Sequence, residues 1–93
     1  MKIHHLKIKA EYALSKLQGT KPFEIRKNDR NFEIGDIINY HCIDSPAVDA
    51  EISARLYEVV YITNYEQQNG YVVFTDRALP ALLTERIKET IEK

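Results

Sequence analysis

Polar and apolar residues follow two different periods in the first part of the chain. Residues 3–8 (IHHLKI) end in alternation, which predicts a short strand. Residues 10–18 change to a helical spacing, in which the apolar side chains stand at i, i+3, i+4 and i+7: Ala10, Ala13, Leu14 and Leu17. Gly19 follows at the position where a left-handed residue commonly ends a helix. We therefore expect a strand and then a helix that ends at this glycine.

Alternation returns directly after that helix, in residues 22–26 (PFEIR). Successive side chains of a strand point to opposite faces, so Phe23 and Ile25 share one face while Glu24 and Arg26 share the other. A sheet normally turns its apolar face toward the core. The pattern therefore predicts that Phe23 and Ile25 are core residues and that the two charged side chains face solvent.

The middle of the chain predicts three further strands. Residues 36–43 (DIINYHCI) are apolar on both faces, which is typical of a strand covered on both sides. Residues 44–51 (DSPAVDAE) are interpreted as a loop, and residues 51–63 as one long strand whose alternation slips phase near Glu58. Such a slip indicates a bulge or bend, which allows a sheet to curl. After a polar loop, residues 71–75 (YVVFT) are expected to form the last strand.

A C-terminal helix is expected over residues 76–93, with Pro80 tolerable only in its first turn. Its apolar residues stand four apart: Leu79, Leu83, Ile87 and Ile91. We expect this narrow stripe to cover the barrel or a second copy of the chain, which would make a homodimer. The order of elements predicts an α+β fold: a small curled β-barrel of about five strands, with an early crossover helix, in a single domain of residues 1–93.

Composition is that of a folded soluble protein, with 44% hydrophobic and 29% charged residues among 93. The net charge of −1 hides an asymmetry. Residues 1–30 carry eight basic and three acidic residues, a net +5, whereas the other 63 carry five basic and eleven acidic residues, a net −6. A basic surface that binds a polyanion would explain this segregation, and so would chance.

Neither a run of 18 apolar residues nor an apolar leader is present, so we expect no membrane segment and a cytoplasmic location.

Cys42 is the only cysteine, which excludes an internal disulfide. The histidines and Cys42 are potential metal ligands. Because adjacent residues of a strand face opposite sides, however, His4 with His5, and His41 with Cys42, each offer one ligand per face. We therefore expect no metal, with Cys42 as a small core residue.

A motif begins at the glycine that ends the first helix. Gly19, Lys21, Glu24 and Arg26 fit the pattern G-x-K-x-x-E-x-R, and RKNDR followed by GD extends it. Together with KIHHLKI at the start and YITNYEQQNGYVVF later, these residues resemble the DUF3850 family, a bacterial and phage branch of the ASCH domains within the PUA-like fold. The resemblance covers residues 2 to about 75, so the C-terminal helix lies beyond it.

The resemblance implies a PUA-like barrel whose cleft is lined by the motif and binds RNA or a nucleotide-like ligand, with no cofactor. An arginine fork would contact phosphate or a base edge, beside the point charge of Lys21. Glu24 would orient Arg26 or accept from a base amino group, and Tyr71 would stack on an exposed base. The expected binding residues are His4, Lys7, Lys21, Glu24, Arg26, Lys27, Asn28, Arg30 and Tyr71.

Three alternatives stay open. In the first, the strand face with Glu24 and Arg26 is only solvated and has no binding role, with an ion pair worth at most about 1 kcal/mol. The second is a small amidohydrolase, because a hydrolytic branch similar to the ASCH domains acts on acylated nucleosides through this lysine, a threonine three residues on and a downstream glutamate. Here Glu24 stands at the threonine position, so Lys21 would work with Glu24 or Glu66 as acid or base. The third is a non-catalytic module that binds a protein partner through the C-terminal helix.

Overall fold

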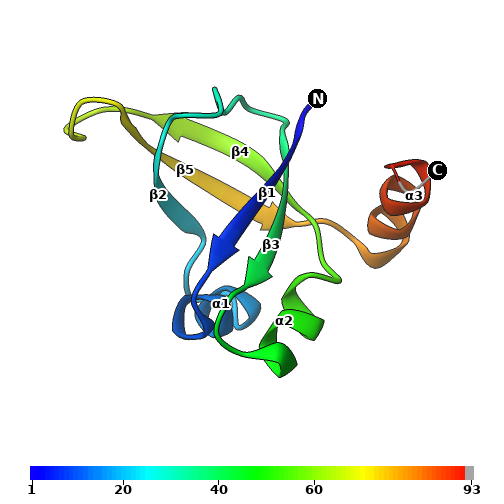
Figure 1. The fold of residues 1–93 in the computed structure, drawn as a ribbon. Helices are drawn as coiled ribbons and strands as arrows, with labels where there is room; N and C mark the ends of the chain where they lie inside the picture. The colour runs from blue at the N-terminus through cyan, green and yellow to red at the C-terminus, as the bar shows by residue number, and fades with distance from the viewer. Residues whose placement is uncertain (92–93) are drawn as a thin grey trace.

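The computed structural model describes residues 1–91 and contains one five-stranded sheet and three helices within that range (Figure 1). The strands are β1 (Ile3–Ile8), β2 (Phe23–Lys27), β3 (Ile37–Cys42), β4 (Tyr57–Thr63) and β5 (Tyr71–Ala78). The helices are α1 (Ala10–Leu17), α2 (Pro46–Ile52) and α3 (Ala81–Ile91). The α+β fold predicted from the sequence is confirmed, although several details differ.

The sheet has the strand order β1-β3-β4-β5-β2, so β1 and β2 are its two edges. β1 runs parallel to β3, and the remaining neighbours are antiparallel. The pairing of β4 with β5 shifts register between Val59 and Tyr61, close to the phase slip expected near Glu58. Such an irregularity bends a strand, and the sheet curls into a half-barrel (Figure 1). We call the open side between β1 and β2 the seam.

Local signals explain how α1 begins and ends. The backbone N–H of Ala10 donates to Asp44 Oδ1 at 2.8 Å, so a side chain beyond β3 satisfies the start of the helix. Gly19 has a φ of +80°, the left-handed conformation expected after a helix end. This glycine turns the chain from α1 toward β2, which carries the motif.

The interpretation of residues 44–51 as a loop is wrong, because α2 occupies most of that stretch. Ser45 is its N-cap and accepts from the backbone N–H of Val48 at 3.3 Å, and Pro46 stands in its first turn. Serine followed by proline is a helix-start signal as well as a turn signal. The expected strand over residues 51–63 therefore begins only at Tyr57.

The predicted phase of β2 is also wrong. Phe23 and Ile25 are 44% and 56% exposed, whereas Glu24 is 3% exposed and Arg26 is half-buried. The apolar core is instead built by other residues, among them Leu6, Ile38, Tyr40, Leu56, Val59, Val72 and Phe74. Strand β2 therefore turns the face with Glu24 and Arg26 inward, and the cations that pair with Glu24 explain this orientation.

The boundary between the last strand and the last helix lies later than expected. β5 continues to Ala78, and α3 begins directly after Pro80, where proline costs no helical hydrogen bond. Residues 92–93 of the predicted helix lie outside the described residues. Over residues 1–91, no helix has the length and apolar character needed to cross a membrane.

Candidate functional site

The motif residues meet at the inward face of β2. The Glu24 carboxylate accepts from Lys21 Nζ at 2.5 Å and from Arg26 Nε and Nη2 at 3.2 and 3.1 Å. A third cation, Lys16 of α1, places its Nζ 3.3 Å from the same carboxylate. Burial alone would raise the pKa of Glu24, but the hydrogen bond from Lys21 and the charges of these cations lower it. Glu24 is thus an ionised buried residue that fixes two partly exposed cations.

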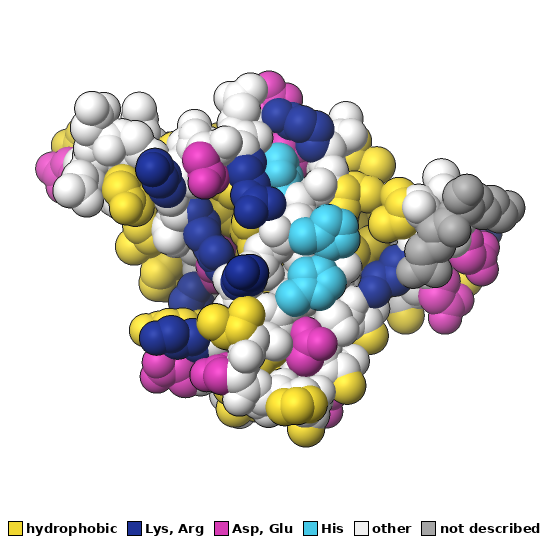
Figure 2. Space-filling view, viewed as in Figure 1, with side chains coloured by type: hydrophobic (Ala, Val, Ile, Leu, Met, Phe, Trp, Pro, Cys, Tyr) yellow, Lys and Arg dark blue, Asp and Glu magenta, His cyan; other side chains and the backbone are white. Residues whose placement is uncertain are grey.

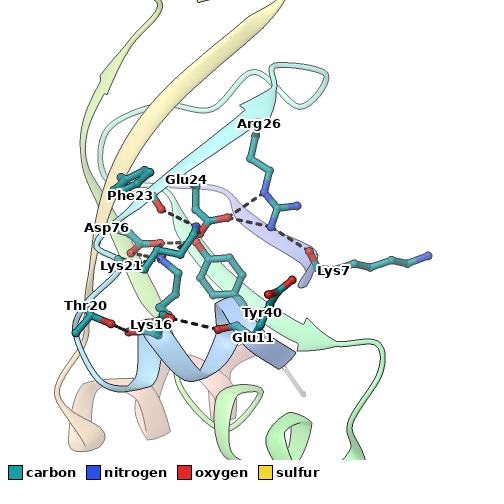
Figure 3. A network of polar contacts seen from close by, with 11 residues as sticks. Lys7, Glu11, Lys16, Thr20, Lys21, Phe23, Glu24, Arg26, Tyr40 and Asp76 are labelled. Atoms are coloured by element: carbon teal, nitrogen blue, oxygen red, sulfur yellow. Dashed lines mark hydrogen bonds and ion pairs between the residues drawn. The ribbon is translucent and has the colours of Figure 1, made fainter. Parts of the chain in front are cut away.

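A second buried carboxylate, Asp76, lies beside this group (Figure 3). Asp76 of β5 accepts from Lys16 Nζ at 3.0 Å and from the hydroxyl of Tyr40 in a short hydrogen bond. Burial raises the pKa of Asp76 and, together with the charges of Asp76 and Glu24, that of Tyr40, so Tyr40 is a neutral donor. Two carboxylates therefore face three cations, which leaves the cluster with one positive charge.

Arginine side chains bridge the seam. Arg26 Nη2 donates to the backbone oxygen of Lys7 at 3.0 Å, and Arg30 Nη1 donates to that of His5 at 2.9 Å. Both carbonyls belong to the unpaired edge of β1, which has no neighbouring strand on this side. The backbone oxygens at the free edge of β1 are therefore satisfied by arginines that lie in β2 or just after it. Figure 2 shows Lys and Arg side chains gathered on this face.

Two hollows lie along the seam and share Lys7 and Arg26. The larger hollow, of about 520 Å³, is lined by Lys7, Ile8, Lys9, Tyr12, Lys21, Phe23, Ile25, Arg26 and Ile43. The smaller hollow, of about 400 Å³, is lined by His5, Leu6, Lys7, Arg26, Lys27, Asp29, Arg30 and Phe32. Within the described residues 1–91, the lining of the larger hollow contains four basic residues and no acidic one.

The structure brings together six of the nine predicted binding residues: Lys7, Lys21, Glu24, Arg26, Lys27 and Arg30. His4 is instead buried, with Nε2 2.8 Å from Asp36 and its ring against Phe32. Asn28 caps a turn by accepting from the backbone N–H of Phe32. Tyr71 pairs in register with Lys27 and lines neither hollow.

Sequence reasoning missed Lys16, Asp76, Tyr40 and Tyr12. A lysine on a surface helix is usually exposed, yet Lys16 is only 5% exposed. A signal did exist, because Lys16 stands three residues after the buried Ala13 and therefore on the same side of the helix. Asp76 was assigned to the start of the last helix and carries no comparable signal.

The histidines form one close pair that spacing along the chain did not indicate. His5 Nδ1 lies 2.9 Å from His41 Nε2, because parallel pairing of β1 with β3 sets Lys7 opposite His41 and brings His5 alongside. In the described part of the chain, residues 1–91, no three potential ligands gather into a metal site.

Two of the groups expected of an amidohydrolase, Lys21 and Glu24, contact each other directly. Lys21 Nζ donates to Glu24 and to the backbone oxygen of Phe23 at 2.9 Å, so both contacts occupy N–H groups of this side chain. Glu66 is exposed in the loop between β4 and β5. Glu24 itself is occupied by its three cations.

Comparison with known proteins gives a family match and a relative. A family model described as "Domain of unknown function (DUF3850)" matches residues 3–75. A protein of Escherichia phage P2, described as an uncharacterized 12.9 kDa protein in the GpA 3′ region, is 34% identical over 65 residues. The aligned part is 69% of this chain and 60% of the relative's length.

Proposed function

We propose that this chain, which belongs to the DUF3850 family, binds RNA or a nucleotide-like ligand along the seam. The observation that carries the proposal is the anchoring of Lys21 and Arg26 by the buried Glu24. Fixed cations bind an anion without first losing side-chain entropy, which is the advantage of a preorganised site. Similarity of the motif to the ASCH pattern supports the same conclusion.

Charge in the larger hollow suits a polyanion. Lys7, Lys9, Lys21 and Arg26 line it, and the adjoining Glu24 carboxylate is buried and neutralised by its partners. A hollow with cations on its wall and low-dielectric protein behind them concentrates anions and speeds their binding. The smaller hollow continues this surface with Lys27 and Arg30 and adds one acid, Asp29.

Arg26 keeps donors for a ligand after its protein contacts are made. Nε and Nη2 donate to Glu24, and Nη2 also donates to Lys7, which leaves the two N–H groups of Nη1 without an acceptor among residues 1–91. The fork therefore faces Glu24 rather than the ligand. We infer that Arg26 offers one nitrogen to a phosphate or base oxygen, with its orientation fixed by the carboxylate.

Binding of short single-stranded RNAs and nucleoside monophosphates at low salt tests the proposal, with titration calorimetry as the measurement. Arg26→Lys keeps the charge but cannot contact Glu24, Lys7 and a ligand at once. It should weaken the preferred RNA by roughly five- to a hundredfold, the effect of one good contact. Arg86→Lys on α3 is the matched control and should leave binding unchanged.

Glu24→Gln separates two roles of the carboxylate. If Glu24 orients Arg26, the variant weakens the preferred ligands most. If Glu24 merely repels phosphate, the variant binds every RNA more tightly. Tighter and sequence-blind binding, or no binding of RNA or nucleotides by the parent chain at low salt, would contradict the proposed function.

A further inference from the structure

The larger hollow holds two exposed aromatic rings that the charge argument does not use. Tyr12 comes from α1 and Phe23 from β2, and they are 47% and 44% exposed. Both rings contact the same ammonium: Lys21 Nζ lies 5.6 Å from the Tyr12 centroid and 5.3 Å from the Phe23 centroid. Each contact is of the cation–π kind and holds a ring beside the lysine.

Aliphatic side chains extend this apolar surface. Ile25 and Ile43 line the same hollow and are 56% and 58% exposed, so the protein itself leaves them uncovered. A ligand that was only an anion would gain nothing from these side chains or from the rings. A planar apolar group next to an anionic group matches the hollow, because cations and exposed apolar surface lie together in it.

Lys21 supplies a specific donor at the rings. An ammonium has three N–H groups, and two of them are used by Glu24 and by the backbone oxygen of Phe23. Among residues 1–91 the third has no acceptor. A charged donor held beside two aromatic rings favours a planar group that carries an oxo oxygen at its edge.

We propose that the larger hollow binds one unpaired nucleobase, packed on Tyr12 and Phe23 with an oxo group on the third donor of Lys21. The adjoining phosphate lies at Lys7 and Arg26, where the two hollows meet. This inference rests on the proposed function and specifies its ligand as single-stranded, because a base inside a duplex has both faces stacked and its edge paired.

The test compares a uridine pentamer with an abasic pentamer of the same charge and with inorganic polyphosphate. The parent chain should bind the uridine pentamer at least fivefold more tightly than the abasic one. Tyr12→Leu and Phe23→Leu should remove most of that difference and leave polyphosphate binding within twofold. Tyr71→Leu is the matched control, since Tyr71 is an exposed aromatic residue that lines neither hollow.

Two further arms test the ligand class. An RNA duplex long enough to stay paired in the assay should bind at least tenfold more weakly than a single strand of the same length at equal salt. An adenosine pentamer, whose base has no oxo group, should bind more weakly than the uridine pentamer. Equal binding of the uridine and adenosine pentamers would overturn the role given to Lys21.

The outcomes also separate this inference from the function on which it rests. A parent chain that binds polyphosphate and RNA, with no loss in the Tyr12 and Phe23 variants, would overturn the base pocket and leave the basic seam intact. A loss caused by Tyr71→Leu alone would do the same. A parent chain that binds none of the three probes would overturn both.

Discussion

Glu24 decides the geometry of the seam because it is both buried and charged. A buried carboxylate is costly unless it is paired and hydrogen-bonded, and removal of one partner from such a group leaves the others uncompensated. Here the carboxylate pairs with Lys16, Lys21 and Arg26 and fixes the direction of the last two. It therefore acts on a ligand through its neighbours rather than by touching it.

Replacing Glu24 with glutamine should destabilise the fold. The change leaves three cations facing Asp76 alone, and we expect the free energy of unfolding to fall by about 3 kcal/mol. Urea unfolding at pH 7 measures it. Glu33→Gln, at an exposed glutamate, is the control and should stay within about 0.5 kcal/mol of the parent.

The same residue predicts a pH dependence. The pKa of Glu24 is lowered from its ordinary 4.5, so folding favours the ionised form. Its contribution to stability is complete above that ordinary value and is lost as pH falls through the lower pKa of the folded state. Between about pH 5 and 3 the parent chain should therefore lose more stability than Glu24→Gln does. Identical acid sensitivity of the two proteins would show that Glu24 is not held ionised by its partners.

The strand β2 shows where sequence reasoning succeeds and where it stops. Its position, its length and the turn at Gly19 follow from local pattern, and all are found. Its phase does not, because alternation identifies two faces without saying which one is buried. Glu24 is buried because it pairs with Lys16, which stands 8 residues before it. Lys16 is in turn held by Asp76, 52 residues after Glu24.

Alanine variants of two phenylalanines test this phase. Phe74 is fully buried, and Phe74→Ala should cost about 3 to 5 kcal/mol of unfolding free energy. Phe23 is 44% exposed, and Phe23→Ala should cost about 1 kcal/mol, because the side chain loses only part of the burial of a core residue. Equal losses in urea unfolding would restore the inward orientation of Phe23 that the sequence pattern predicts.

Helix α3 leaves apolar side chains uncovered and lies beside the sheet (Figure 1). Leu82, Leu83 and Ile91 are 65%, 43% and 45% exposed. The helix is tied to the rest of the chain by the buried Thr84 and by Lys88 Nζ, which donates to the backbone oxygen of Ser53 at 2.5 Å. Its role in a homodimer stays a prediction.

Substitution of the exposed leucines Leu82 and Leu83 tests whether the chain forms a dimer through α3. At tens of micromolar, sedimentation equilibrium should give twice the chain mass for the parent and the single mass for Leu82→Glu with Leu83→Glu, because charges at a paired apolar face would be desolvated. Glu85→Gln is the control and should keep the parent's mass. A parent chain that sediments as a monomer would contradict the prediction.

The segregation of charge along the chain becomes a segregation in space. Basic residues of the first 30 positions lie in β1, α1 and β2 or in the segments directly next to them. The curled sheet sets the two edge strands across the seam from each other. Lys2 and Lys16 are the exceptions, since Lys2 lines neither hollow and Lys16 is buried beside Asp76. From the sequence, a basic surface and chance explain the charge segregation equally well, and the assignment of each lysine to a surface requires the fold.

This division of the lysines gives the last prediction, which concerns how RNA affinity depends on salt. Lys9 lines the larger hollow and Lys27 the smaller one, and both are exposed, so each would meet a phosphate as a point charge. Lys9→Gln and Lys27→Gln should each weaken all single-stranded RNAs alike and reduce the slope of log affinity against log salt by roughly 0.7 per lost contact.

Lys16→Gln serves as the contrast to those two variants. Removing this lysine leaves Asp76 and Glu24 short of a buried partner, so it should lower the stability of the fold rather than act as a lost phosphate contact. Salt titrations of the folded variants at a temperature well below unfolding separate the two effects. A slope that does not change in either Lys9→Gln or Lys27→Gln would mean that phosphates do not follow the seam, whatever the affinity of the parent chain.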